Sequence, residues 1–152
     1  MEKLIVFMGE SGTGKTTLKE RFAQETNATE VVTYTTRPIR PGEIPNKTYH
    51  YISKQVFAMM ALDNEFAEYT YYKTIAGTWY YGTSLDSLTG DGIKVAVLNP
   101  EGVRALKKKG IPMNVVYIKC SGKTLQQRLE NRGDDPREIK RRLEAEIGRA
   151  HV

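Results

Sequence analysis

The chain has 152 residues, of which 39% are hydrophobic and 27% are charged, and its formal net charge is +5 at pH 7. This profile is typical of one globular domain, and no apolar run approaches the roughly 20 residues that a membrane helix needs. No basic run is interleaved with aromatic residues, so we expect a small anionic ligand and no nucleic-acid, membrane or obligatory protein partner. The single cysteine, Cys120, excludes an internal disulfide and favours a cytoplasmic setting.

The first part of the chain predicts strands around a glycine-rich loop. Residues 3–8 include an apolar run and predict a buried strand, which is followed by the loop and by a helix at about 15–24. Residues 31–34 are β-branched and aromatic and predict a second strand. A loop at 35–42 with two prolines comes next, and residues 49–52 predict a further short strand.

The middle of the chain predicts a helix and a β-hairpin. The helix covers about 54–62, and we expect its inward side chains to be Val56, Phe57, Met59 and Met60. Residues 66–82 are rich in Tyr, Thr and Trp, with a predicted turn at Ala76-Gly77. This piece is too irregular to join a parallel sheet, so it predicts an inserted β-rich subdomain.

The last part returns to alternating strands and helices. Residues 93–98 and 113–118 predict strands on either side of a helix that has Asn99 as its N-cap and ends near Lys109. The lysines at its end, 107–109, are interpreted as a solvated helix end, where cations suit the helix dipole. Two more helices are expected beyond Ser121. The alternation predicts an α/β fold with a parallel sheet flanked by helices.

The glycine-rich loop meets every fixed position of the motif G-x-x-x-x-G-K-[ST], with the run Gly9-Glu10-Ser11-Gly12-Thr13-Gly14-Lys15-Thr16. A buried strand before it and a helix after it complete the context of a phosphate-binding loop. Glycines let successive N–H groups point at one anion, and the helix N-terminus adds its positive end. We therefore expect this run and Thr17 to bind ATP, with Lys15 acting on the phosphates and Thr16 ligating Mg²⁺.

A second set of residues is more specific than this loop. It comprises Thr33-Tyr34-Thr35-Thr36-Arg37-Pro38-Ile39-Arg40-Pro41-Gly42-Glu43, then Tyr49, Asn64-Glu65-Phe66-Ala67-Glu68 and Tyr81-Gly82-Thr83. In order and spacing, apart from a slightly longer hairpin before Tyr81, the set resembles guanylate kinase. With the phosphate-binding loop, the resemblance covers residues 1 to about 147. It implies a P-loop NTPase-type kinase that transfers the γ-phosphate of ATP to GMP or dGMP.

The resemblance also implies roles for single residues. The phosphate of GMP would be held by Arg37, Arg40, Tyr49 and Tyr81, and the guanine would be read by Glu68, Thr33 and Thr83. The chemistry supports these roles, because guanidinium groups bind phosphate bidentately and one carboxylate accepts both neighbouring donors of guanine. Taken singly, each of these residues could instead be a surface charge or an ordinary strand residue.

By the same resemblance, Arg132 and Arg142 would close over the ATP phosphates as catalytic arginines, with a lid at about 131–138. The expected division is one kinase domain, 1–152. Its core comprises 1–34 and 83–152, and its subdomain for the nucleoside monophosphate is 35–82.

Two departures from the family pattern keep alternatives open. The family pattern Asp-x-Asp-x-x-Gly is replaced by Val97-Leu98-Asn99-Pro100-Glu101-Gly102, so both aspartates are absent. The family also continues with another strand and helix beyond the point where this chain ends. Two competing interpretations therefore stay open. One is a P-loop kinase for another nucleotide or small phosphorylated acceptor, and the other is an inactive guanylate kinase-like binding module.

Overall fold

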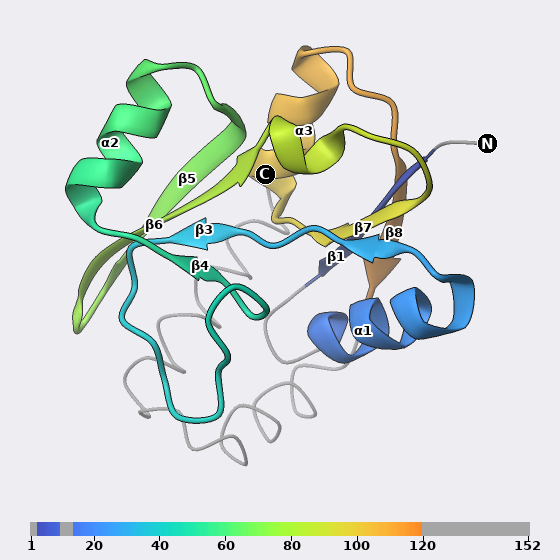
Figure 1. Ribbon diagram of the computed structural model, residues 1–152, viewed down its shortest axis with the longest axis horizontal. Helices are drawn as coiled ribbons and strands as arrows, with labels where there is room; N and C mark the ends of the chain where they lie inside the picture. Colours follow the sequence, from blue (N-terminus) through green and yellow to red (C-terminus); the bar gives the residue numbers. More distant parts are fainter. Residues whose placement is uncertain (1–2, 10–13, 120–152) are drawn as a thin grey trace.

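The computed structural model describes residues 3–9 and 14–119, which form two four-stranded sheets with helices packed on them (Figure 1). The first sheet has the strand order β2-β7-β1-β8, and every pair in it is parallel. Its strands are β1 (Leu4–Gly9), β2 (Thr29–Glu30), β7 (Lys94–Val97) and β8 (Asn114–Ile118). Helices α1 (Lys15–Thr26) and α3 (Pro100–Lys108) connect them, so the predicted parallel sheet flanked by helices is confirmed.

The second sheet has the order β4-β3-β6-β5 and is mixed. Its strands are β3 (Tyr34–Thr35), β4 (His50–Tyr51), β5 (Phe66–Thr74) and β6 (Gly77–Ser84). The antiparallel hairpin β5–β6 turns at residues 75 and 76, one residue before the predicted turn. A short 3₁₀ helix, Asp86–Leu88, follows the hairpin before the chain returns to the first sheet.

The predicted strand at 31–34 is wrong in one respect, because these residues pass from one sheet to the other. The Val31 amide still donates to the Val95 carbonyl beside β7, whereas Tyr34 already pairs with Gly82 of β6. One run of β-branched and aromatic residues therefore serves two sheets, which sequence periodicity cannot distinguish from one strand.

Helix α2 (Lys54–Leu62) has the predicted bounds and is capped by Ser53, whose hydroxyl accepts from the Val56 amide at 3.1 Å. Two of its expected inward residues are wrong, because Val56 and Met59 are 43% and 63% exposed. Phe57 alone is fully buried in this helix, with its ring centroid 4.5 Å from that of Phe66. A helix of little more than two turns contacts the sheet along a narrower line than its apolar content suggests.

The main hydrophobic core joins the two sheets. It combines residues in or next to the strands of the first sheet and residues of α3 with Ala67 of β5: Leu4, Val6, Val31, Ala67, Ala96, Leu98, Val103 and Leu106. Helix α3 and strand β5 pack directly on each other. Among the described residues, no helix is long and apolar enough to cross a membrane.

Candidate active site

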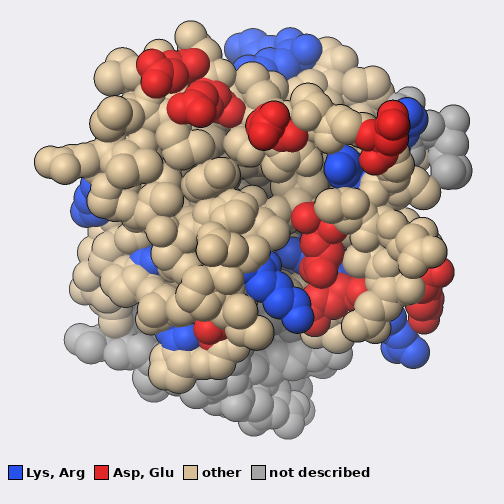
Figure 2. Space-filling view, viewed as in Figure 1, with Lys and Arg blue, Asp and Glu red and all other residues tan. Residues whose placement is uncertain are grey.

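A cleft of about 400 Å³ lies between the two sheets. One wall comes from the ends of β1 and β7 and the start of α1, and the other comes from β5, β6 and the loop before β4. Figure 2 shows basic and acidic side chains next to each other near the centre of the face drawn there. The predicted site residues that line the cleft are Gly9, Lys15, Thr16, Thr33, Arg40, Tyr49, Glu68 and Tyr81.

The described residues on either side of the phosphate-binding loop, Gly9, Lys15 and Thr16, line the cleft. Gly14 precedes α1 with φ of 87°, a left-handed conformation that glycine adopts without strain. The Lys15 ammonium donates to the carbonyl oxygen of Gly9, so this side chain points back toward the end of β1. Thr17 lies on the exposed side of α1 and does not line the cleft. The predicted residues Glu10, Ser11, Gly12, Thr13, Arg132 and Arg142 lie outside the described residues.

A buried carboxylate occupies another part of the cleft. Glu68 of β5 is 6% exposed, and the hydroxyl of Thr83 on the neighbouring strand donates to its Oε1 at 2.6 Å. Burial raises the pKa of Glu68 above its ordinary value, although Thr83 and the charge of Lys109 act in the opposite direction. Thr83 is fully buried and therefore holds Glu68 from behind instead of lining the cleft.

Lys109 has a contact that the interpretation as a solvated helix end missed. Its ammonium donates to the Phe66 carbonyl at 3.1 Å, which brings a positive charge near Glu68. The lysine run at the end of α3 thus contributes one residue to the surroundings of the site.

Two tyrosines and two arginines gather at the loop before β4. The rings of Tyr49 and Tyr81 meet edge to face, with centroids 5.8 Å apart, and both line the cleft together with Arg40. Arg37 lies behind this pair, with its guanidinium 5.2 Å from the centroid of the Tyr49 ring. Arg37 is 6% exposed and lies outside the cleft lining.

Glu43 holds this loop together, a role that the sequence reasoning did not assign. Its carboxylate accepts from both Arg37 terminal nitrogens, at 2.9 and 2.8 Å, and from the Arg40 amide at 2.8 Å. The Tyr51 hydroxyl also donates to it at 2.9 Å. Partial burial opposes ionisation, but these donors outweigh it and lower the pKa of Glu43 to about 2. The sequence feature that could have indicated this role is the position of Glu43, six residues after Arg37 and inside the run 33–43 that resembles guanylate kinase.

Burial disfavours the charged form of Arg37, but the Glu43 carboxylate outweighs it and raises the pKa of the guanidinium above its ordinary value. Burial and the Glu43 hydrogen bond together raise the pKa of Tyr51 to about 12. Both side chains therefore keep their protons throughout the neutral range, and the loop carries a fixed arrangement of donors.

Asn99 lies at the end of β7, where the family pattern has aspartate. It is the N-cap of α3, as predicted: its Oδ1 accepts from the Gly102 amide at 2.7 Å. Its Nδ2 donates to the hydroxyl of Tyr72 on β5. The amide therefore connects the first sheet to the second, and both residues line the cleft.

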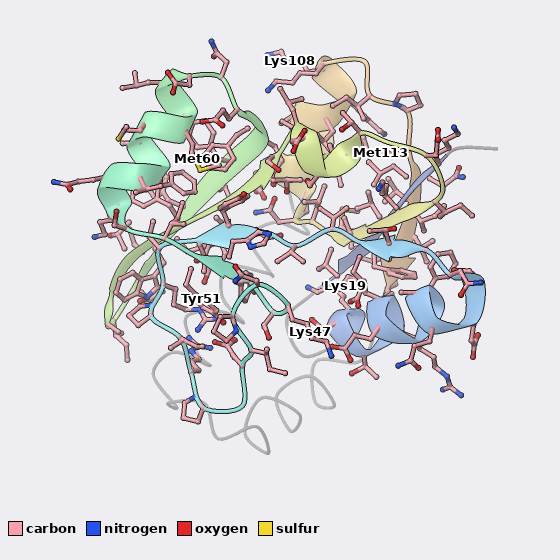
Figure 3. All side chains as sticks on the ribbon, viewed as in Figure 1. Lys19, Lys47, Tyr51, Met60, Lys108 and Met113 are labelled. Atoms are coloured by element: carbon pink, nitrogen blue, oxygen red, sulfur yellow. The ribbon has the colours of Figure 1, made fainter. Side chains whose placement is uncertain are left out.

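Two lysines in the cleft were also missed. The side chains of Lys19 on α1 and Lys47 in the loop before β4 extend into the space between these two elements (Figure 3). Lys19 is 11% exposed and lies 3.7 Å from the carboxylate of Glu30. Lys19 stands one helical turn after Lys15, so the spacing alone places both on one face of the helix.

The parallel sheet, the glycine loop before α1 and a cleft between two sheets define an α/β protein of the P-loop type with a site for anionic ligands. The model of the family described as guanylate kinase matches residues 1–150. The chain belongs to the guanylate kinase family.

Relatives agree with this assignment. The guanylate kinase of Neisseria gonorrhoeae (strain ATCC 700825 / FA 1090) is 35% identical over 148 residues, 92% of this chain and 70% of that protein. The guanylate kinase of Histophilus somni (strain 129Pt) is 33% identical over 144 residues, 90% of this chain and 68% of that protein. The crystal structure of guanylate kinase from Anaplasma phagocytophilum has the same fold, with a TM-score of 0.69 and 18% sequence identity over 99% of this chain and 72% of that chain.

Proposed function

We propose that this protein transfers the γ-phosphate of ATP to GMP or dGMP, giving ADP and GDP or dGDP. One observation carries the acceptor assignment within the family: the buried Glu68 carboxylate opens into the same cleft as Lys15. Guanine offers two neighbouring donors, N1–H and the exocyclic amine, and one carboxylate accepts both. Adenine lacks this pair, so binding it would give the buried carboxylate no donor from the ligand.

The acceptor phosphate is assigned to the Tyr49 and Tyr81 end of the cleft, where Arg40 also lies. Arg37 supports this end from behind Tyr49, because Glu43 already occupies its guanidinium in the absence of ligand. A nucleotide phosphate would therefore compete with Glu43 for Arg37 or leave the pair intact and bind through the tyrosines. Thr33 lines the cleft and is proposed, with Thr83, to support reading of the base.

The donor phosphates are assigned to the glycine loop and Lys15. Phosphoryl transfer depends on holding donor and acceptor in line and on neutralising the charge that develops on the phosphoryl oxygens. Lys15 supplies positive charge at the donor end. Arg132, in the lid at about 131–138, and Arg142, beyond the lid, are proposed to add to it. We also propose that the residues divide as expected, with 35–82 forming the acceptor subdomain.

The residues present fit Mg²⁺ that arrives with ATP. Thr16 lines the cleft next to Lys15 and offers one hydroxyl oxygen. Within the described residues, no group of three or more His, Cys, Asp or Glu side chains forms a metal site. Mg²⁺ needs no such cage, because it keeps several waters and uses substrate phosphates as ligands. When bound, the ion would neutralise phosphate charge, and Thr16 would hold it. The cytoplasm, where ATP and GMP are available, is the proposed location.

The proposal is tested by measuring ADP release from Mg-ATP with GMP, with dGMP and without an acceptor. We expect release with either guanine nucleotide and almost none without one. Lys15→Ala should lower the turnover number by roughly 10²- to 10³-fold, because it removes the positive charge that stabilises the phosphoryl group during transfer. Lys107→Ala, at the exposed end of α3, is the matched control and should behave as wild type. Near-normal turnover by Lys15→Ala would contradict the donor site.

A further inference from the structure

Strand β5 contains a bulge directly before the residue assigned to the base. Phe66 pairs with Ser84 of β6, and Glu68, two residues later, pairs with the residue next to Ser84. Ala67 is therefore one residue more than β6 provides at this point, which defines a β-bulge. A bulge interrupts the alternation of side chains along a strand and changes the direction of the next side chain. The direction of the Glu68 side chain thus depends on the shape of this bulge.

The side chains around the bulge show this change of direction. The Phe66 ring faces α2, with its centroid 4.5 Å from that of Phe57. Regular alternation would turn Glu68 to the same face of the sheet. Instead, Glu68 lines the cleft, and Ala67 is fully buried in the main core. The bulge therefore lets one short segment pack an aromatic ring against α2 and direct a carboxylate into the cleft.

Helix α3 contacts the bulge near its start and at its end. In its first turn, a Cβ built on Gly102 would lie 3.2 Å from Oε2 of Glu68, so the helix backbone lies directly against the carboxylate. At the other end, the C-cap residue Lys109 donates from its ammonium to the Phe66 carbonyl at 3.1 Å. Lys109 therefore connects the first residue of the bulge to a helix that packs on the same strand.

Three neighbouring elements bring polar groups to the Glu68 carboxylate. Burial raises the pKa of Glu68, and the Thr83 hydroxyl of β6 and the Lys109 ammonium of α3 oppose this effect. Asn99, at the end of β7, lies on the other side of Gly102, and its amide does not ionise. Thr83 is also neutral, so Lys109 is the group among these three that supplies charge.

We propose that Lys109 is a positioning residue for recognition of the acceptor base: it holds the bulge that directs Glu68 into the cleft and places an opposite charge near the carboxylate. The inference rests on the proposed function for the identity of the base that Glu68 reads. Lys109 lies outside the cleft lining, so it acts through Glu68 and not by contact with the nucleotide.

The test measures the dissociation constant of GMP by titration calorimetry at neutral pH for wild type, Lys109→Met, Glu68→Gln and the double variant. Lys109→Met keeps an unbranched apolar side chain but removes the donor and the charge. We expect it to bind GMP about three- to tenfold more weakly. In the Glu68→Gln background, the same change should alter GMP affinity by less than about twofold, because the carboxylate that Lys109 positions is already replaced.

Two further variants separate positioning from a general effect of charge or folding. Lys109→Arg keeps a cationic donor and should recover most of the affinity for GMP. Lys108→Met removes the same charge from the exposed neighbouring residue at the end of α3 (Figure 3) and should bind GMP as wild type. ATP affinity should be unchanged in every variant.

The pH profile of GMP binding is a readout that a merely structural role would not move. Loss of a nearby positive charge disfavours the ionised carboxylate of Glu68. GMP affinity should therefore begin to fall at a higher pH in Lys109→Met than in wild type, whereas the profile of Lys108→Met should match that of wild type.

GMP affinity in Lys109→Met that equals or exceeds that of wild type would overturn the inference. An equal loss of affinity with and without Glu68→Gln would also overturn it, because Lys109 would then act by a route other than Glu68. These outcomes are independent of the proposed function, which fails if wild type releases no ADP with GMP. Wild type that does not bind GMP at all would contradict both.

Discussion

Glu68 is the residue on which we propose that the choice of acceptor depends. Its carboxylate is buried, held on one side by Thr83 and near the ammonium of Lys109. Burial raises its pKa, so the site holds a carboxylate that loses its proton less readily than an exposed one. A ligand with two parallel donors stabilises the ionised form and is therefore favoured over a ligand without them.

Replacement of Glu68 by glutamine should weaken GMP binding by roughly 10- to 100-fold, because the amide nitrogen opposes one guanine donor and leaves a buried group unpaired. ATP affinity should remain within twofold of wild type. Dissociation constants measured by calorimetry check both statements. Glu65→Gln, three residues earlier and exposed, is the matched control. Equal affinity for GMP in Glu68→Gln and wild type would show that another group reads the base.

The pKa of Glu68 also predicts a pH dependence of GMP binding. A protonated carboxyl group accepts poorly, so GMP affinity should be constant at high pH. It should fall by up to about tenfold per unit as pH drops below the raised pKa of this group. Glu68→Gln should lack this dependence. GMP dissociation constants between about pH 7 and pH 4.5 measure it, and parallel curves for the two proteins would contradict the assignment.

At the scale of elements, the loop between β3 and β4 is held by a network around one carboxylate. Glu43 receives hydrogen bonds from Arg37, Arg40 and Tyr51, and Arg37 in turn lies over the Tyr49 ring. Three prolines stiffen the same loop, at positions 38, 41 and 45. The result is a pre-organised group of donors beside the cleft, which would lower the entropy cost of binding the phosphate that we propose for this end.

Because the pKa of Glu43 is lowered to about 2 from an ordinary 4.5, its contribution to stability is present above about pH 4.5 and is lost as pH falls toward 2. Glu43→Gln should therefore lower the free energy of unfolding at pH 7 by about 2 kcal/mol, with a difference that narrows below pH 4.5. Urea denaturation at pH 7, 5, 4 and 3 measures this. Glu25→Gln, which removes an exposed ion pair with Arg21, should change stability by less than about 0.5 kcal/mol. If the free energies of unfolding of wild type and Glu43→Gln differed by the same amount at every pH, the charge of Glu43 would not be the cause.

The junction of β1 with the phosphate-binding loop depends on close contact with β8. A Cβ at Gly9 would lie 2.3 Å from the carbonyl oxygen of Ile118, so no side chain fits without separating the two strands. Gly9→Ala should lower the free energy of unfolding by about 1 to 3 kcal/mol and weaken ATP binding as well. Thermal unfolding with and without Mg-ATP measures both effects. A variant with wild-type stability and ATP response would show that β8 moves easily.

At the scale of the whole molecule, a cleft lies between the two sheets. Each sheet, with the segments connected to it, contributes residues to the lining of this cleft. Helix α3 and strand β5 form a packed contact between the two halves, through Ala67 and the core around it (Figure 1). The Asn99 to Tyr72 hydrogen bond is a second connection, inside the cleft itself. The proposed donor and acceptor sites are thus joined by contacts that do not depend on a bound nucleotide.

Much of this arrangement was predictable from sequence. The apolar run before the glycine loop and the cap at Asn99 are local signals, and both elements have the expected positions. The passage of residues 31–34 from one sheet to the other was not predictable, because the same β-forming residues satisfy both sheets. Helix periodicity also failed for Val56 and Met59, whose exposure depends on how α2 meets its sheet.

Within the site, the sequence motifs indicate which residues take part but not which residues they contact. The pairing of Arg37 with Glu43 and the donation from Asn99 to Tyr72 join residues whose relation depends on loop conformation and on contact between sheets. Such contacts are tertiary and leave no periodic pattern in the chain. The structure therefore refines the expected role of Arg37, which stands behind Tyr49 instead of lining the cleft.

The central claim is that the cleft selects guanine. It is tested most directly by the ratio of kcat/KM for GMP to kcat/KM for AMP, CMP, UMP and dTMP, measured as ADP release from Mg-ATP. We expect GMP and dGMP to be preferred by roughly 10⁴-fold, since the other bases lack the donor pair that Glu68 accepts. Turnover of another acceptor at a rate equal to that of GMP would contradict the claim.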